Sequence, residues 1–316
     1  MLAAPKVQMQ ISPTKFKLEA SDRQALEDLK KLIEHQEWGC QADMNAALKN
    51  IEAALTEHYG WSSSPALREK IGAAVEVKAQ RLRVAPEEYC RIAASSFSEM
   101  LALVEEVSLG ETWFFREPHQ FDYLRDVIFP SLIESGVERL RIWSAACSTG
   151  EEAYSLVIAF EQFASSYPQA RAEVFATDVR NRALMGASRA RYKGDSLREV
   201  APQTLERYFE RGTDSTGEFD GTHVVIADVR RRVTFRRVNL LERAYWKSMP
   251  NRFDLIVCSN LLTFLSNAAA RQVVTNITNS LREGGYLMVA PGEESLVVFP
   301  HMTHAKEHFS FFQRPG

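Results

Sequence analysis

Apolar residues recur every three or four positions along most of the first 110 residues, which is the spacing of amphipathic helices. This spacing predicts helices that begin near Ser21, Met44, Ser64 and Pro86. The last of them is expected to continue to about Val107. Residues 1–20 contain two prolines and show little periodicity, which indicates a mobile arm. The pattern therefore predicts an arm at 1–20 and a helical N-terminal domain at 21–110.

Beyond Gly110 the pattern changes to short apolar runs that alternate with helical stretches. The runs RIWSA, EVFATD, FDLIVCSN and GYLMVAP are interpreted as buried strands, and the stretches 151–164, 180–191 and 267–282 as helices. Such alternation is typical of a mostly parallel, doubly wound sheet of the Rossmann-like α/β class, whose ligands bind at the carboxyl ends of the strands. The closing run HFSFFQR is expected to form an antiparallel strand at the edge.

A segment at about 194–238 interrupts this alternation. It contains a short helix near 205–209, a polar turn from Gly212 to Gly221, and the runs HVVIADV and RVTFRRV, which are predicted to pair as strands. We therefore expect a small inserted β-subdomain. The predicted domain boundaries after the helical domain are therefore a junction at 111–139 and a sheet domain at 140–316.

Composition, charge and cysteine spacing argue against several classes of protein. The chain has 316 residues, 45% of them hydrophobic, and a net charge of −3, which gives no global reason to expect a nucleic-acid partner. No apolar run reaches the roughly 18 residues of a membrane span, and the N-terminus lacks a signal-peptide core. The four cysteines have no metal-type spacing, so free thiols and no metal site are expected. We predict a cytoplasmic monomer without membrane insertion.

The stretch RIWSAACSTGEEAYS, residues 141–155, combines a strand, a turn of small residues and the start of a helix. Backbone N–H groups at a helix start are unpaired, and small side chains let a ligand approach the backbone closely. Glu151 and Glu152 stand in the first helical turn. The helix dipole alone would favour acids there, so a ligand-binding role and a structural role both remain open.

Asp178 ends the strand EVFATD, the position at which nucleotide-type sheets bind ribose hydroxyls, although an aspartate that caps the next helix is an alternative. The small-residue turn keeps only Gly150 of the GxGxxG pattern that suits a pyrophosphate. A nucleoside cofactor without phosphates fits better, because Glu151 or Glu152 would accept hydrogen bonds from a cationic amino group. S-adenosylmethionine has this chemistry.

Two further groups of residues are candidates for the site. Three consecutive aromatics precede Arg116 in the run ETWFFREP, which suggests a lid, although core packing would also explain the aromatics. Asn239-Leu240 and Asn260-Leu261 follow later strands. Asparagine side chains there can contact an adenine edge or a carboxylate, or can simply form turns at strand ends.

The motifs ETWFFREPHQF, RIWSAACSTGEEAYS, ATD, ERYF, VNLL, FDLIVCSN and LREGGYL occur in the order typical of the CheR family of chemoreceptor glutamate O-methyltransferases. The chain resembles that family over about residues 67–314. The resemblance implies methyl transfer from S-adenosylmethionine, with S-adenosylhomocysteine as product, to glutamates of a methyl-accepting chemoreceptor or similar signalling protein. It also implies that a β-subdomain at about 211–233 docks receptors.

Position by position, the resemblance implies a set of cofactor-side residues: Thr112, Arg116, Ala145, Glu151 or Glu152, Asp178, Asn239, Leu240, Asn260 and Leu261. Arg116 and Phe264 are the expected catalytic residues. Arg116 would orient the substrate carboxylate, and Phe264 would face the sulfonium as a weak cation–π partner. A glutamate side chain is already ionised at neutral pH, so its attack on the methyl group needs no general base.

The chain departs from the family pattern at Ser259, where an arginine is usual, and at Phe264, where a tyrosine is usual. These departures leave a non-catalytic cofactor- or receptor-binding protein as one alternative. Arginine clusters at 180–198 and 230–237 leave an RNA methyltransferase as another, although solvated helix faces would also explain them. Cys147 has no positioned histidine beside it in the sequence and is interpreted as a small loop residue.

Overall fold

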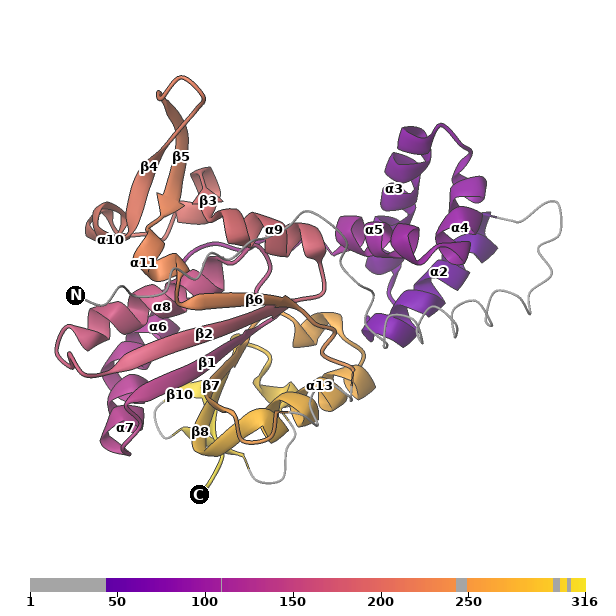
Figure 1. Cartoon of the computed structure of the whole chain (residues 1–316). Coiled ribbons are helices and arrows are strands. Elements are labelled where there is room, and N and C mark those ends of the chain that lie inside the picture. The colour runs from indigo at the N-terminus through magenta and orange to yellow at the C-terminus, as the bar shows by residue number, and fades with distance from the viewer. Residues whose placement is uncertain (1–43, 109, 243–248, 298–301, 306–307) are drawn as a thin grey trace, which may run out of the picture.

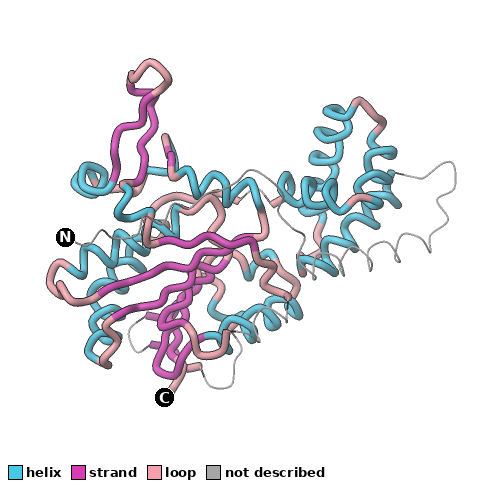
Figure 2. Tube along the Cα trace, in the orientation of Figure 1, coloured by secondary structure: helices cyan, strands magenta, loops and turns pink. Residues whose placement is uncertain are grey.

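The computed structural model describes residues 44–108, 110–242, 249–297, 302–305 and 308–316 of the chain. The predicted arm and the helix predicted from Ser21 lie outside these ranges. Four helices form the described part of the N-terminal domain: α2 (Met44–Tyr59), α3 (Pro65–Leu82), α4 (Pro86–Ser95) and α5 (Phe97–Val107). They pack around a shared apolar core, and Figure 2 shows that this domain holds helices and loops but none of the sheet.

Serine caps define where two of these helices begin. Ser64 Oγ accepts a hydrogen bond from Leu67 N at 3.0 Å, and Pro65 occupies the first helical position, as the sequence predicts. The single helix predicted from Pro86 to about Val107 is wrong in one respect. Ser96 takes an extended backbone and caps α5, so the run divides into α4 and α5.

The second domain is built on a seven-stranded sheet with the order β6-β2-β1-β7-β8-β10-β9. Its strands are β1 (Arg139–Ala145), β2 (Arg171–Asp178), β6 (Val233–Arg237), β7 (Phe253–Cys258), β8 (Leu281–Val289), β9 (Thr303–Ala305) and β10 (His308–Gln313). The strands β6, β2, β1, β7 and β8 are parallel, whereas β10 pairs antiparallel with β8 and β9 pairs antiparallel with β10. The direction of winding reverses between β1 and β7, which is where ligands of doubly wound sheets bind.

Side chains alternate between the two faces of the sheet. On β1, Ile142 points into a core shared with the helices on one face, and Trp143 points into the core on the other. The first face is covered by α6 (Pro118–Tyr123), the π-helical turn η1 (Leu124–Ile128), α7 (Phe129–Glu134), α8 (Glu151–Ala164) and α9 (Asn181–Arg189). The second is covered by α13 (Asn267–Ser280). The predicted doubly wound fold is confirmed.

The inserted segment forms a second, three-stranded sheet with the order β3-β5-β4, which projects away from the helical domain (Figure 1). Its elements are β3 (Arg191–Tyr192), the 3₁₀ turn η2 (Gly194–Leu197), α10 (Pro202–Tyr208), β4 (Phe209–Thr213), β5 (Phe219–Val225) and α11 (Ala227–Arg230). The predicted small antiparallel β-subdomain is present.

Two pairings differ from prediction. The run RVTFRRV does not pair with HVVIADV, because α11 separates them and β6 joins the main sheet parallel to β2. The closing strand β10 is antiparallel, as predicted, but does not form the edge, since β9 pairs with its outer side.

Candidate active site

A cavity of about 890 Å³ lies at the carboxyl ends of the parallel strands, between the sheet domain and the helical domain. Its walls come from the loops after β1, β2, β6 and β7, from the junction segment at 110–121 and from the chain between α2 and α3. The volume is in the range of pockets that enclose a small organic ligand. The cavity lies at the reversal point of the sheet.

The loop after β1 is bent tightly against the end of β2. Cys147 N donates to Thr177 O at 2.8 Å, and Ala146 and Ser148 both adopt positive φ. Gly150 also has a positive φ, and a Cβ there would lie 2.7 Å from Ala187 Cβ. Glycine is therefore required by both the backbone conformation and the space. The loop presents Ala146, Cys147 and Ser148 to the cavity.

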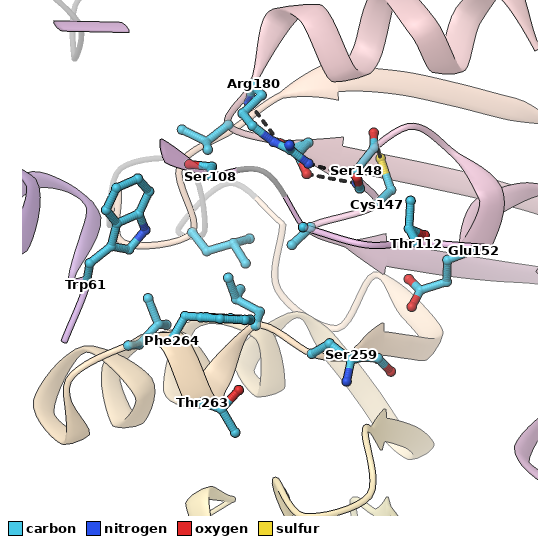
Figure 3. Close-up of a pocket in the computed structure, with 18 of the residues that line it drawn as sticks. Trp61, Ser108, Thr112, Cys147, Ser148, Glu152, Arg180, Ser259, Thr263 and Phe264 are labelled. Atoms are coloured by element: carbon cyan, nitrogen blue, oxygen red, sulfur yellow. Dashed lines mark hydrogen bonds and ion pairs between the residues drawn. The ribbon is translucent and has the colours of Figure 1, made fainter. Parts of the chain in front are cut away.

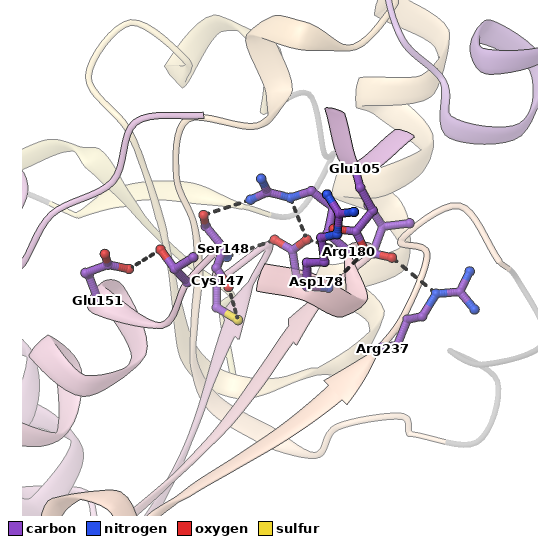
Figure 4. A network of polar contacts seen from close by, with 10 residues as sticks. Glu105, Cys147, Ser148, Glu151, Asp178, Arg180 and Arg237 are labelled. Atoms are coloured by element: carbon purple, nitrogen blue, oxygen red, sulfur yellow. Dashed lines mark hydrogen bonds and ion pairs between the residues drawn. The ribbon is translucent and has the colours of Figure 1, made fainter. Parts of the chain in front are cut away.

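Asp178 lies at the end of β2, lines the cavity and is almost fully buried (Figure 4). Its Oδ2 accepts from Ser148 N at 2.8 Å, and its Oδ1 accepts from Arg180 N at 2.9 Å and Arg180 Nε at 3.2 Å. The Arg180 guanidinium also donates to Ser148 Oγ at 2.8 Å. A carboxylate has about four acceptor positions, so this network leaves about one of them open at Asp178. Arg180, which the sequence interpretation did not single out for the site, controls how many are free.

Glu151 and Glu152 differ sharply although they are adjacent. Glu152 lines the cavity and accepts from Ser144 Oγ at 2.5 Å. Burial, reinforced by the nearby carboxylate of Glu293, raises its pKa to about 7 against the opposing effects of Ser144 and Arg116. Glu151 accepts from Thr149 Oγ1 at 2.6 Å and from Ser196 Oγ at 3.1 Å, outside the cavity.

The junction segment packs against the sheet domain, and these contacts account for most of the aromatics that suggested a lid. Phe114 is fully buried, with edge-to-face contacts to Tyr192 and Phe209 at 4.8 and 5.0 Å between ring centroids. Phe115 N donates to Ser155 Oγ at 2.9 Å. Core packing therefore explains two of the three aromatics, and only Trp113 lines the cavity.

The loop after β7 is held by a residue that sequence interpretation missed. Glu293 is 1% exposed, and its carboxylate accepts from Asn260 N at 2.9 Å, Thr263 N at 3.1 Å and Ala290 N at 3.2 Å. Burial raises its pKa. The signal in the sequence is an acid that follows the strand end in MVAPGEES, but its partners lie about 30 residues earlier.

The helical domain is joined to the same loops. Asn239 Nδ2 donates to His58 O at 2.8 Å, and Ser62 N donates to Phe264 O at 2.9 Å. Trp61 forms an isolated antiparallel bridge with Leu265. Trp61 and Phe264 both line the cavity, and Figure 3 shows them at the same end of it. Phe264 is 56% exposed, so it lies at the mouth rather than in the interior.

Three buried polar atoms without a hydrogen-bond partner in the described part of the chain belong to residues that line the cavity. They are Ser108 Oγ, Arg116 Nε and Ser259 Oγ. Unpaired buried polar groups cost free energy unless a ligand or water satisfies them. These atoms therefore indicate where a polar ligand would be stabilised.

The structure brings most of the predicted site residues together. Those that line the cavity are Thr112, Arg116, Glu152, Asp178, Asn239, Leu240, Asn260, Leu261 and Phe264. Two of the predicted residues, Ala145 and Glu151, do not line the cavity. Ala145 is fully buried, because its side chain still follows the strand alternation into the core beside α13. Glu151 turns to Thr149 and Ser196, because successive residues of a helix face different directions. Cys147 is buried and its pKa is raised by burial, which opposes a nucleophilic role.

A doubly wound sheet with an antiparallel final strand pair and a cavity at its reversal point is the architecture of a Rossmann-like α/β ligand-binding domain. Residues 110–310 match the family described as CheR methyltransferase, SAM binding domain, and the chain belongs to this family. The cofactor of this domain is S-adenosylmethionine. The cavity fits such a cofactor, because it offers a buried carboxylate and backbone loops without the glycine-rich pyrophosphate turn.

Curated relatives agree with this assignment. The chain is 35% identical over 220 residues to chemotaxis protein methyltransferase 1 of Pseudomonas aeruginosa, a match that covers 68% of this chain and 74% of the relative. It is 32% identical over 195 residues to the chemotaxis protein methyltransferase of Escherichia coli, covering 62% and 64%. A third relative, "Probable biofilm formation methyltransferase WspC" of P. aeruginosa, is 33% identical over 254 residues, covering 78% and 57%. Within the described residues, no helix has the length and apolar character needed to cross a membrane.

Proposed function

We propose that this protein transfers the methyl group of S-adenosylmethionine to glutamate side chains of a chemoreceptor or a related signalling protein. The relatives named chemotaxis protein methyltransferase support the receptor as substrate. The observation that carries the proposal is that one cavity holds both an acidic group suited to a cation and a basic group suited to an anion. A buried carboxyl, Glu152, suits a cationic cofactor, and the unpaired Nε of Arg116 suits an anionic substrate.

On the cofactor side, Glu152 would accept hydrogen bonds from the amino group of the methionine moiety. Asp178 would accept from a ribose hydroxyl through the acceptor position that Ser148 and Arg180 leave open. Thr112, Leu240, Asn260 and Leu261 would complete the walls around adenine and methionine. The Asn239 side chain already bridges to His58 O, so we propose that it fixes the helical domain beside the cofactor.

On the substrate side, this chain has to bind, align and desolvate a carboxylate that is already ionised. The cofactor, when bound, supplies an electrophilic methyl group on a sulfonium. Arg116 would orient the attacking carboxylate, since its Nε is buried and unpaired. Ser259 Oγ would donate a second hydrogen bond. Phe264 would shield the methyl group from water at the mouth of the cavity.

Methyl transfer from radiolabelled S-adenosylmethionine to purified receptor cytoplasmic fragments tests the proposal. The expected result is base-labile label on glutamates, because carboxyl methyl esters hydrolyse in alkali. Asp178→Asn should reduce this labelling. Asp254→Asn is its matched control, since Asp254 is another buried aspartate that accepts a backbone hydrogen bond, from Arg141 N at 2.6 Å, at the opposite end of the sheet. Wild-type protein that binds the cofactor but labels no receptor fragment would contradict the proposal.

We propose the cytoplasm as the place of action. The free, buried thiols of Cys90, Cys147 and Cys258 support this, because thiols stay reduced in that compartment. We also propose that the enzyme acts as a monomer. Sedimentation of the purified protein tests this directly, and a stable dimer at micromolar concentration would contradict it.

A further inference from the structure

Trp113 carries two guanidinium groups on one indole ring. Arg198 Cζ lies 3.5 Å and Arg116 Cζ 4.5 Å from the ring centroid. Arg198 makes no ion pair with a carboxylate in the described residues, and Arg116 donates only to the carbonyl of Glu111, at 2.8 Å. Two cations close to one ring repel each other, and an anion bound between or beside them would relieve that repulsion. We call Arg116, Trp113 and Arg198 the arginine–tryptophan stack.

The backbone that leads to Arg198 is fixed by two contacts of Ser196, one to the junction segment and one to Glu151. Arg198 follows η2, and η2 is attached to the junction segment because Phe114 N donates to Ser196 O at 2.9 Å. Ser196 Oγ in turn donates to the buried carboxylate of Glu151 at 3.1 Å. Glu151 thus ties the turn that carries Arg198 to the loop after β1, because it also accepts from Thr149 Oγ1.

The three members of the stack run from solvent into the cavity. Arg198 is exposed, Trp113 is half-buried and lines the cavity, and Arg116 is half-buried with its Nε enclosed. A guanidinium stacked on an aromatic ring keeps the N–H donors of its edge free for bidentate binding of a carboxylate. Arg198 is therefore preorganised for an anion just outside the point at which Arg116 would hold the reacting group.

We propose that Arg198, stacked on Trp113, is a substrate-binding residue that holds a second acidic side chain of the protein substrate, next to the glutamate that is methylated. The inference rests on the proposed function for the identity of that glutamate. It adds a specificity: glutamates with an acidic neighbour on the same face of the substrate are preferred over isolated ones.

The first experiment measures binding without turnover. Short poly-L-glutamate is titrated into protein saturated with S-adenosylhomocysteine, with poly-L-glutamine as the neutral probe. Arg198→Glu is expected to weaken poly-L-glutamate binding by at least about tenfold, with Arg198→Lys intermediate. The matched control is Arg207→Glu, because Arg207 is also exposed and also lies over an aromatic ring, Tyr208 at 5.3 Å, but that ring does not line the cavity as Trp113 does. It should change binding less than about twofold.

Equal binding of poly-L-glutamate by wild type and Arg198→Glu would overturn the inference. So would equal binding of the two polymers by wild type, or tighter Arg198-dependent binding of oligouridylate, which would assign the stack to a phosphate chain. Because this readout needs no methyl transfer, it separates the inference from the proposed function. Absence of methyl transfer with intact Arg198-dependent binding would contradict only the latter.

The second experiment tests the specificity with kinetics. Receptor fragments are compared with variants in which the acids that neighbour each methylated glutamate are changed to amides. Wild type is expected to lose kcat/KM on the amide variants through a higher KM, and Arg198→Glu is expected to treat both fragments alike. Discrimination that persists unchanged in Arg198→Glu would overturn the assignment.

Discussion

Two loops leave neighbouring parallel strands at the same edge of the sheet and border the same cavity, yet they are held differently. The loop after β1 is fixed by the adjacent strand β2: Cys147 N donates to Thr177 O, and Ser148 N donates to the carboxylate of Asp178. The loop after β7 is held from outside by the carboxylate of Glu293, which accepts from Asn260 N and Thr263 N.

Because the two loops are held by different residues, substitutions at those residues should have different effects. The first takes its shape largely from backbone contacts, and the side chain that helps to hold it, Asp178, also faces the cavity. Changes there should act mainly on cofactor binding. The second takes its shape from Glu293, which is not among the residues that line the cavity. Its loss should therefore affect stability and the shape of the site together.

The largest effect is expected for Glu293→Ala. The change leaves three backbone N–H groups, of Asn260, Thr263 and Ala290, without their acceptor, so the free energy of unfolding should fall by about 3 kcal/mol. Urea denaturation measures it. The control is the neighbouring Glu294→Ala, which loses contacts to Ser310 Oγ and Gly292 N nearer the surface and should cost about 1 kcal/mol. Equal costs for the two variants would refute the anchoring role.

Asp178→Asn should have the next largest effect, on cofactor affinity. The affinity for S-adenosylhomocysteine is expected to fall by about 10- to 100-fold, since a charged acceptor at the proposed ribose position becomes a neutral amide. Calorimetry measures this change. Asp254→Asn removes the charge of another buried carboxylate, which pairs with Arg282 at 2.5 Å, and should leave the affinity unchanged. Unchanged binding by Asp178→Asn would remove Asp178 from the cofactor site.

The third effect is a pH dependence that separates the two adjacent glutamates. Glu152 has a pKa raised to about 7 in the cofactor-free protein, and a cationic amino group would bind its ionised form. Affinity for the cofactor should therefore be highest above pH 7 and fall by about tenfold between pH 8 and pH 6. Glu152→Gln should abolish this dependence, and Glu151→Gln should retain it because Glu151 does not line the cavity. Calorimetry at several pH values distinguishes them.

The comparison of the loops also explains what the sequence could predict. The residues of the first loop and Asp178 were found because a strand, a small-residue turn and a helix start are local patterns. Glu293, Arg180 and Trp61 were missed because their roles depend on contacts between distant segments or on the direction of a side chain. The same limit applied to the two glutamates, since the sequence places both at a helix start and only packing decides which one faces the cavity.

The smallest effect is expected for Ser259, whose hydroxyl has no partner in the described residues, whereas the hydroxyl of Ser155 makes two hydrogen bonds. Ser259 Oγ is buried without a partner in the described residues, so Ser259→Ala should change the free energy of unfolding by less than about 0.5 kcal/mol. Ser155→Ala is the matched control. Its hydroxyl accepts from Phe115 N at 2.9 Å and donates to Glu151 O at 2.7 Å, so its loss should cost about 1 to 2 kcal/mol.

The two serine variants should behave in the opposite order in the methyl-transfer assay. If Ser259 donates to the substrate carboxylate, Ser259→Ala should lower kcat/KM by a few fold while leaving cofactor affinity and stability intact. Unaltered kcat/KM would mean that water, rather than substrate, satisfies this hydroxyl. A large loss of stability would instead show that Glu293 is not alone in holding the loop after β7, because Ser259 belongs to that loop.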